Sequence, residues 1–399
     1  MNRHAPADAI TGSAAPIGAQ VYLTGLGTAV PAHALGQEQV AREAADMFSG
    51  RYAEFDRLQP VFESTGIETR YSVRPFSWFR DPHDWADRTE AYLEGGEDLF
   101  LRAAQAALDD AGLEAACVDA VVTVSSTGIA TPSLEARAMT ALGLRADVLR
   151  VPVFGLGCAG GVTGLAIARD LAASAPGRVV LLVAVELCTL AFRTDKLTKA
   201  NVVATALFGD GAASAVLVNG GVVDANMRSA SPNALEAPSV PDPTDRTDAG
   251  AGPLALGHAR QVTWPGTLDI MGWDVDPVGF GAIFSRSIPT LVHERMGAAA
   301  DTFLTEAGLE QAHLAQMIFH PGGTRVLEAL TEVFSLAPDV LAAERDVLRE
   351  FGNMSAPTVL FVLKRKRDAG VSGNAMMGAL GPGFTASFLA LDATADGPT

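Results

Sequence analysis

The sequence has few cysteines, and no motif pairs them. Only three, Cys117, Cys158 and Cys188, occur among 399 residues, and no two of them form a Cys-x-x-Cys pair. This scarcity argues against a disulfide framework and against a zinc site built on cysteine pairs. Because free cysteines are typical of a reducing compartment, we expect a cytoplasmic protein without a bound metal.

Long hydrophobic runs are also missing. The longest aliphatic run, 179–185, is far shorter than the roughly 20 residues that a membrane-spanning helix needs. The first 20 residues are rich in Ala and Pro and contain no apolar stretch typical of a signal peptide. We therefore expect a flexible tail over 1–20 and no integral membrane association.

Basic residues are scarce as well. The chain has 29 Lys and Arg against 46 Asp and Glu, which gives a formal net charge of −17 at pH 7. Such a charge argues against a nucleic-acid-binding surface over the whole protein, although a local arginine cluster could still bind an anionic ligand. Hydrophobic residues make up 48% of the chain, enough to bury a large core.

A faint internal repeat organises the chain. Ala-Gly-Leu occurs at 111–113 and at 307–309, each time between a helix-like stretch and an apolar strand. A similar offset separates Gly-Cys at 157–158 from Gly-Asn at 352–353. Two copies of one α/β unit, related by a pseudo-twofold axis, would produce this pattern. Such an axis would bring Cys158 and Asn353 face to face.

The repeat divides the chain into a first half at 21–219 and a second half at 220–399. Continuous apolar strands, typical of sheets covered on both faces, are expected at 21–28, 119–125, 151–154, 178–186, 213–218, 316–320, 356–364 and 385–391. Helices are expected near 37–48, 97–112, 160–175, 287–308 and 324–334. A segment at 229–257, rich in Pro, Asp and Gly, is predicted to be a surface insertion.

Cys158 is the candidate nucleophile. It follows an apolar strand and a glycine-rich turn and precedes a helix-forming stretch. A thiol at a helix N-terminus is exposed to a field and to free N–H groups that favour the thiolate. The flanking glycines would let a thioester approach closely. The alternative is a small buried cysteine, and we favour that alternative for Cys117 and Cys188.

His320 and Asn353 complete a possible catalytic set. His320 ends an apolar strand before a Pro-Gly-Gly turn, and Asn353 follows a glycine. Together with Cys158 they supply a nucleophile, an acid or base, and an amide donor. The thiolate could accept an acyl group from a thioester. His320 and Asn353 could then stabilise the enolate that a second thioester forms by losing carbon dioxide, without a metal or a redox cofactor.

Six ordered motifs between about 21 and 391 resemble those of type III polyketide synthases, the relatives of plant chalcone synthases. They are LGCAGG, ELCTLAFR, LFGDGAAS, HPGG, FGNMSAPTVLFVL and ALGPGF. The resemblance implies a thiolase fold, with two pseudo-twofold-related halves in αβαβα layers, and a homodimer. It implies that Cys158, His320 and Asn353 form the catalytic triad. The substrates would be an acyl-CoA starter and malonyl-CoA, and the products a resorcinol, phloroglucinol or pyrone.

The resemblance also implies roles around the cavity. Phe208 would be a gatekeeper between the CoA tunnel and the cavity, and a second gatekeeper falls near Trp273 or Asp274. Cys188 and Ala191 stand where the plant enzymes carry threonines. The other implied cavity residues are Glu186, Leu380, Gly381 and Pro382. Because Ser64 replaces a plant lysine that contacts CoA, the implied CoA-binding residues are Arg70, Gly322 and Gly323. The block 263–280 is similar to that of bacterial enzymes that make alkylresorcinols or alkylpyrones.

Three other functions fit part of the pattern. A 3-oxoacyl-carrier-protein synthase III would share the fold and the triad but would condense only once, and the HPGG motif favours the polyketide branch. A papain-like hydrolase also has Cys, His and Asn in this order, yet it would not explain the repeat. A non-catalytic partner subunit would typically lack the nucleophile, which this chain retains as Cys158.

Overall fold

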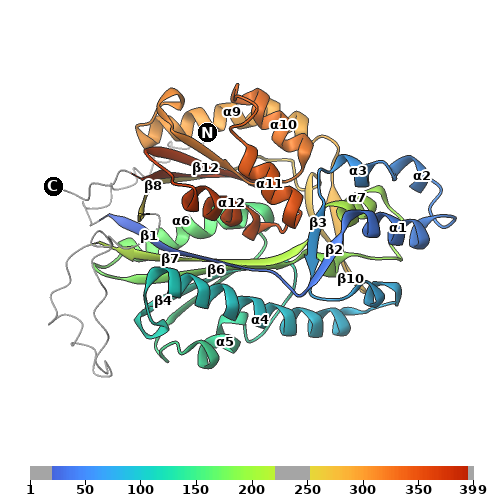
Figure 1. Cartoon of the computed structure of the whole chain (residues 1–399), viewed down its shortest axis with the longest axis horizontal. Helices are drawn as coiled ribbons and strands as arrows, with labels where there is room; N and C mark the ends of the chain where they lie inside the picture. The colour runs from blue at the N-terminus through green and yellow to red at the C-terminus, as the bar shows by residue number, and fades with distance from the viewer. Residues whose placement is uncertain (1–19, 221–251, 394–399) are drawn as a thin grey trace, which may run out of the picture.

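A nine-stranded sheet forms the centre of the molecule (Figure 1). The computed structural model describes residues 20–220 and 252–393. The strand order is β11-β12-β13-β8-β1-β7-β6-β4-β5. The first half of the chain contributes β1 (Val21–Ala29), β4 (Ala120–Val124), β5 (Leu149–Val153), β6 (Val179–Leu187) and β7 (Asp210–Asn219). The second half contributes β8 (Leu254–Thr263), β11 (Gln316–Phe319), β12 (Asn374–Gly381) and β13 (Thr385–Asp392).

The strand order confirms the two related halves. From the middle of the sheet outward, the first half runs β1-β7-β6-β4 and the second half runs β8-β13-β12-β11. Within each half the first strand in sequence pairs with the last. Only three residue pairs, between β1 and β8, join the halves through the sheet. The equivalent elements therefore follow one another in the same spatial order in both halves.

Helices cover the strands in the five layers predicted for the fold. Two helices, α6 (Gly160–Ala173) and α12 (Ala356–Asp368), lie between the two halves and contact strands of both (Figure 1). The first half is covered on its outer face by α4 (Trp85–Ala111) and α5 (Leu134–Leu142). The second half is covered by α9 (Ile288–Ala307) and α10 (Thr324–Val333).

The two Ala-Gly-Leu tripeptides end equivalent helices. α4 ends at its tripeptide with Gly112 at φ 63°, and α9 ends at its own with Gly308 at φ 68°. The next residues, Leu113 and Leu309, donate backbone hydrogen bonds to carbonyl oxygens five positions earlier in each helix. This is the Schellman arrangement, in which glycine accepts the left-handed conformation without strain. The repeat seen in the sequence is thus a structural repeat.

The strand predicted at 356–364 is wrong, because these residues form most of α12. This helix lies between the strands of the two halves, so nearly all of its sides are buried, and an apolar run does not distinguish such a helix from a strand. Pro357 falls in its first turn, where a proline is tolerated.

The limits of two other predicted segments also differ. The insertion predicted at 229–257 is too long, because residues 254–257 begin β8, and residues 221–251 lie outside the described part of the chain. The helix predicted from 97 begins at Trp85. Its Gly95 and Gly96, which interrupt the helical pattern, pack against Val73 and Leu134, so no side chain would fit at these positions without a shift.

Smaller elements gather at one end of the molecule, to the right in Figure 1. They are β2 (His33–Gly36), α1 (Gln37–Phe48), α2 (Phe55–Leu58), α3 (Val61–Ser64), β3 (Thr69–Ser72), α7 (Lys199–Leu207) and the hairpin of β9 (Met271–Asp276) and β10 (Gly279–Phe284). The last helix before the catalytic asparagine candidate, α11 (Ala342–Phe351), runs toward this end from the second half. These elements surround the residues singled out by the sequence.

Candidate active site

Cys158 lies in a single 3₁₀ turn, Gly157–Ala159, directly before α6. Gly157 has φ 48°, a left-handed conformation that glycine adopts readily, and Pro382 packs against it where a side chain would otherwise lie. The thiol is buried, with 9% of the residue exposed. Its Sγ lies 3.9 Å from Oδ1 of Asn353. The predicted meeting of these two residues is therefore confirmed.

Backbone and side-chain contacts fix the amide of Asn353. Its Oδ1 accepts a hydrogen bond from the backbone N–H of Ser355 at 2.8 Å. Its Nδ2 donates to the carbonyl oxygen of Gly322 at 3.2 Å. Since an amide NH₂ has two protons, one N–H of Asn353 is left for a substrate oxygen. Ser355 has φ 58°, an uncommon conformation for a residue other than glycine, at the start of α12.

His320 follows β11 and is held by its backbone. Its N–H donates to Gly378 of β12 at 2.9 Å, and its carbonyl oxygen accepts from Gly322 at 3.0 Å. The imidazole is buried, and neither ring nitrogen has a hydrogen-bond partner among the described residues. Two free ring nitrogens leave this side chain able to exchange a proton with a bound group.

Cys158, His320 and Asn353 line one pocket. The rest of its wall is almost entirely apolar and comes from the second half of the chain: Met271, Phe284, Ile288, Met296, Phe319, Gly322, Val326, Leu330, Gly378, Ala379 and Leu380. The hairpin, α9, α10 and β12 all contribute to this wall. The three polar side chains therefore share a pocket whose wall is otherwise almost entirely apolar.

Burial, with a smaller contribution from the carboxylate of Glu186, raises the pKa of the Cys158 thiol to about 11. The expectation that the helix start would favour the thiolate is therefore wrong for this site, because desolvation is the largest influence on the pKa. Burial also lowers the pKa of His320 to about 3. Both shifts favour the neutral forms of the two side chains.

Glu186 does not line the cavity, contrary to what the resemblance implies. It is fully buried near the end of β6, where Ser126 donates to it through the backbone N–H at 2.9 Å and through the hydroxyl at 2.7 Å. Burial raises its pKa to about 7. Ser355, which the sequence analysis missed, hydrogen-bonds both Glu186 and Cys158. The sequence offered one clue to Ser355, which stands two residues after Asn353 within the motif FGNMSAPTVLFVL.

Phe208 adjoins the catalytic amide through the backbone. The N–H of Asn353 donates to the carbonyl of Leu207 at 2.9 Å, and the N–H of Gly209 donates to the carbonyl of Asn353 at 3.0 Å. The ring of Phe208 packs edge-on against Trp273 and Phe284, at centroid distances of 5.7 and 6.0 Å. Phe284 lines the catalytic pocket, so the ring of Phe208 lies beside that pocket.

A second pocket lies on the other side of Phe208. Cys188, Ala191 and Phe208 line it, as the resemblance implies for cavity residues, together with aromatic side chains such as Phe76 and Phe79. Arg70 also lines it, but only 2% of this residue is exposed. The role predicted for Arg70 as a contact for CoA phosphates is therefore wrong, because its guanidinium does not reach solvent.

The remaining predicted residues lie close to the triad. Leu380 lines the catalytic pocket. Gly381 packs against the carbonyl of Leu156, where an added Cβ would lie 2.5 Å from that oxygen, so this turn supports the nucleophile. Gly322 lines the pocket, and Gly323 begins α10 beside Leu207. The structure thus brings all of them to the site.

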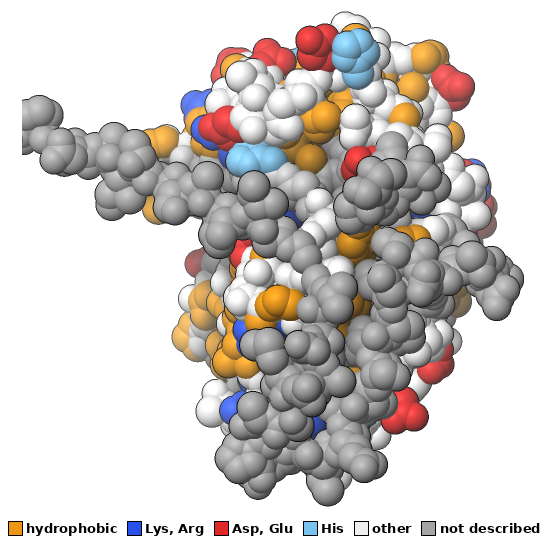
Figure 2. Space-filling model, turned by 90° about the vertical axis from the view of Figure 1, so that its left-hand side faces the viewer, with side chains coloured by type: hydrophobic (Ala, Val, Ile, Leu, Met, Phe, Trp, Pro, Cys, Tyr) orange, Lys and Arg blue, Asp and Glu red, His pale blue; other side chains and the backbone are white. Residues whose placement is uncertain are grey.

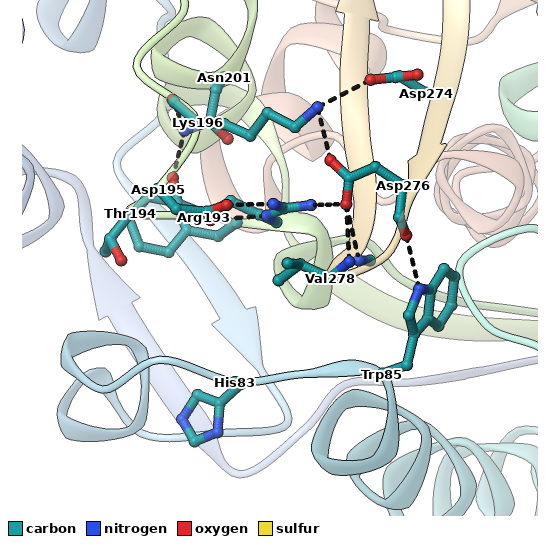
Figure 3. A network of polar contacts seen from close by, with 12 residues as sticks. His83, Trp85, Arg193, Thr194, Asp195, Lys196, Asn201, Asp274, Asp276 and Val278 are labelled. Atoms are coloured by element: carbon teal, nitrogen blue, oxygen red, sulfur yellow. Dashed lines mark hydrogen bonds and ion pairs between the residues drawn. The ribbon is translucent and has the colours of Figure 1, made fainter.

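A charged network anchors the hairpin that carries Trp273 and Phe284 (Figure 3). Arg193, buried beneath the hairpin, pairs with Asp276 at 2.7 Å. Lys196 pairs with both Asp274 and Asp276 at 2.8 Å. The indole N–H of Trp85, at the start of α4, donates to the carbonyl of Asp276 at 2.7 Å. Hydrogen bonds from Lys196 and Arg193 hold the pKa of Asp276 well below its usual range.

Four basic residues that were not predicted lie near one another, because the charges of Arg57, Arg286 and Arg325 all act on Lys199, as does that of Glu54. Arg57 lies on α2, Lys199 begins α7, Arg286 precedes α9 and Arg325 lies in the first turn of α10. Desolvation and the positive charges of Arg286 and Arg325 lower the pKa of Lys199. On the opposite end of the molecule, the visible Lys and Arg side chains are scattered over the described surface (Figure 2). Only the fold brings these four segments together.

The described residues contain no group of three or more side chains able to hold a metal ion. Within the same residues, no helix is long and apolar enough to cross a membrane. All three cysteines are buried, and none of them forms a disulfide.

The sequence matches the family models of chalcone and stilbene synthases, the N-terminal domain over residues 11–221 and the C-terminal domain over 255–392. It is 36% identical to a 1,3,6,8-tetrahydroxynaphthalene synthase of Streptomyces peucetius, over 91% of each chain. It is 34% identical to a putative chalcone synthase of Bacillus subtilis, over 92% of this chain and 97% of the relative.

The fold is similar to that of solved structures as well. The crystal structure of 1,3,6,8-tetrahydroxynaphthalene synthase from Streptomyces coelicolor, a bacterial type III polyketide synthase, aligns with a TM-score of 0.81 at 26% identity. The alignment covers 93% of this chain and 99% of that one. The polyketide synthase domain of Steely1 from Dictyostelium aligns equally well at 25% identity.

The neutral state of the site predicts that His320 controls the reactivity of Cys158. In His320→Gln, the thiol has to ionise at its own raised pKa of about 11. We expect iodoacetamide to label Cys158 more slowly than in the wild type at pH 7, with a rate that rises about tenfold per pH unit up to pH 9. Peptide mass spectrometry measures the labelling, with Cys117 and Cys188 as internal controls. Equal labelling of variant and wild type at pH 7 would contradict this role.

Proposed function

Because the chain belongs to the chalcone and stilbene synthase family of type III polyketide synthases, we propose that it extends a fatty acyl starter and cyclises the product to an alkylresorcinol or alkylpyrone. Enzymes of this family use acyl-CoA and malonyl-CoA as substrates. The observation that carries the fatty acyl starter is the apolar wall of the cavity that the triad lines. The three catalytic groups suit each step of the chemistry.

Loading is a thioester exchange on Cys158. His320 takes the thiol proton, the sulfur attacks the carbonyl carbon of acyl-CoA, and CoA leaves as a thiolate that recovers the proton from His320. The acyl group is then held on the protein and His320 is neutral again, as its low pKa requires. The energy of one thioester bond replaces that of another, so the step needs no further driving force.

Extension begins with decarboxylation of malonyl-CoA. Loss of carbon dioxide leaves an enolate, whose oxygen can accept hydrogen bonds from the imidazole N–H of His320 and from the second Nδ2 proton of Asn353. A preorganised donor in a desolvated site contributes about 3–4 kcal/mol to such a step. The enolate carbon attacks the acyl carbonyl and displaces the Cys158 sulfur. The chain, two carbons longer, returns to Cys158 for the next cycle.

The starter's alkyl tail would enter the apolar end of the cavity between α9 and α10. Met296 and Leu330 approach this end from the two helices. Burial of each methylene contributes about 0.8 kcal/mol, so an alkyl chain would bind better than a short or polar starter. In the second pocket, Cys188 and Ala191 replace hydroxyl-bearing threonines and keep that wall apolar as well.

We also propose that Arg57, Lys199, Arg286 and Arg325 hold the phosphates of CoA. Arg325 stands two residues after Gly323, in the helix start beside the catalytic pocket. Helix starts and clustered cations both favour phosphate. The repulsion that lowers the pKa of Lys199 would be relieved by a bound anion. This cluster takes over the role first assigned to Arg70.

We propose that the protein forms a homodimer through the edge of the sheet at which β5 lies. The terminal strand, β5, pairs with β4 alone, and its outward side is open. Large hydrophobic side chains are exposed next to it, with Phe154 at 59% and Leu149 at 44%. An exposed hydrophobic edge is a template for pairing, and a second copy of the same edge would cover it. The lack of a disulfide among the three cysteines supports the cytoplasmic setting that we propose.

The starter class can be tested with purified protein, malonyl-CoA and a series of acetyl-, hexanoyl-, decanoyl- and palmitoyl-CoA. We expect cyclised products of two or more condensations, formed fastest with a long alkyl starter. Leu330→Phe should shift the preference toward shorter starters because it fills the apolar end. Leu304→Phe, in the same core cluster but outside the pocket wall, is the matched control. Release of a single-condensation β-keto product alone would instead indicate a 3-oxoacyl synthase.

The CoA cluster predicts a change in KM. Arg325→Ala and Lys199→Ala should each raise KM for both CoA thioesters about tenfold, since a charge-assisted hydrogen bond is worth about 1.5 kcal/mol. The value of kcat should stay the same, because neither side chain lines the catalytic pocket. Arg42→Ala, which removes an exposed arginine from α1, should leave KM unchanged. A KM for Arg325→Ala equal to that of the wild type would exclude the cluster as the phosphate site.

The dimer predicts a change in molar mass. Phe154→Asp places a charge on the open edge of the sheet, so the protein should elute as a monomer in size-exclusion chromatography with light scattering. Leu268→Asp changes a side chain that is 80% exposed elsewhere and should leave the dimer intact. A wild-type protein that is monomeric at micromolar concentration would disprove the proposed assembly.

A further inference from the structure

Arg70 makes its polar contacts with the end of α7. Its Nη1 donates to the carbonyl oxygens of Thr205 at 2.5 Å and of Phe208 at 3.2 Å. Phe208 is the residue at which α7 ends. The last carbonyls of a helix lack partners within it and carry partial negative charge. The guanidinium of Arg70 therefore closes this helix end and holds the backbone of Phe208.

The same side chain also touches the turn before Asn353. A Cβ added to Gly209 would lie 3.2 Å from Cβ of Arg70, and one added to Gly352 would lie 3.3 Å from it. These two glycines flank the backbone bridge that joins Phe208 to Asn353. Arg70 thus fills the space between the segment after Phe208 and the turn before the catalytic amide.

The stability of the fold does not explain why an arginine stands here. The side chain is almost fully buried, and no acidic side chain among the described residues pairs with it. Its Nε and Nη2 have no hydrogen-bond partner in the described structure. Burial lowers its pKa to about 9, which leaves it charged at neutral pH. A buried charge with unfilled donors is unfavourable, and a hydrophobic residue of similar volume often costs less.

We propose that Arg70 is a positioning residue that keeps the gatekeeper Phe208 and the catalytic amide of Asn353 in register. This inference rests on the proposed function, because the ring and the amide have to serve the same growing chain. Movement of the Phe208 carbonyl shifts the ring against Trp273 and Phe284, and Phe284 lines the cavity. It also shifts Asn353, whose N–H and C=O bond the residues on both sides of Phe208.

The role predicts a specific kinetic pattern for Arg70→Met. A displacement of about 1 Å at reacting groups costs up to about 100-fold in rate, so kcat should fall while KM for both CoA thioesters stays within about twofold. The products should shift toward short chains released after fewer condensations. Arg70→Lys should recover part of kcat and of the longer products, because an ammonium group can still donate to the two carbonyls.

The matched control is Arg367→Met. Arg367 is also a buried arginine, but it lies near the far end of α12, where it pairs with Asp110. We expect a lower melting temperature and an unchanged ratio of long to short products per folded molecule. If Arg70→Met does not fold, Arg70→Lys and Arg70→Gln provide the same comparison of kcat, KM and products.

Decarboxylation of malonyl-CoA without a starter separates this inference from the proposed function. It requires the donors of His320 and Asn353 but no chain extension. A wild type that decarboxylates malonyl-CoA but never extends a starter would disprove the proposed function. The rates of decarboxylation of the Arg70 variants could then still be compared with that of the wild type. A rise in KM at constant kcat would return Arg70 to CoA binding and overturn the inference. A loss of rate that only follows the loss of folded protein, as in Arg367→Met, would overturn it too.

Discussion

The site depends on the close contact between the first turns of α6 and α12, where the two halves of the chain meet. A Cβ added to Gly161 would lie 2.4 Å from the carbonyl oxygen of Ala356, and one added to Gly160 would lie 3.2 Å from Cβ of Ala356. Only small residues allow this approach. Cys158 lies just before the start of α6, and Asn353 lies just before the start of α12. The contact between the two helices therefore sets the distance between the nucleophile and the amide. The small residues of both motifs are therefore structural requirements of the chemistry.

Much of this arrangement could be predicted from the sequence, because the repeat leaves traces at fixed offsets. The paired Ala-Gly-Leu helix ends, most sheet strands and the meeting of Cys158 with Asn353 follow from it. His320 has no counterpart in the repeat, so its place at the end of an apolar strand suggested a role and the resemblance to a family made that role specific. The buried helix α12 could not be recognised as a helix from the sequence. Nearly all of its sides are buried, so its apolar residues do not follow the 3.6-residue periodicity of a surface helix. The burial of Arg70 and the cluster of four cations could not be predicted from the sequence, because both depend on contacts between segments far apart in the chain.

Burial governs the chemistry as much as geometry does. Desolvation raises the pKa of Cys158 and lowers that of His320, so the resting site carries no charge on either group. In the mechanism that we propose, proton transfer between them would create a pair of opposite charges in one step, which would avoid an isolated buried ion. The same dry environment would strengthen the hydrogen bonds that His320 and Asn353 offer to an enolate oxygen. Under this proposal, the apolar wall serves the chemistry as well as the recognition of an alkyl chain.

The cavity wall combines the repeated core with smaller elements. Most of the wall comes from α9, α10 and β12 of the core, whereas the hairpin of β9 and β10 contributes Met271 and Phe284. Phe208, which follows α7, packs against that hairpin. These smaller elements are joined to the core by a few polar anchors: the Asp276 network, the Phe208 backbone bridge and Arg70. Because these anchors are buried and local, a change in one can alter the cavity while the core and its chemistry persist.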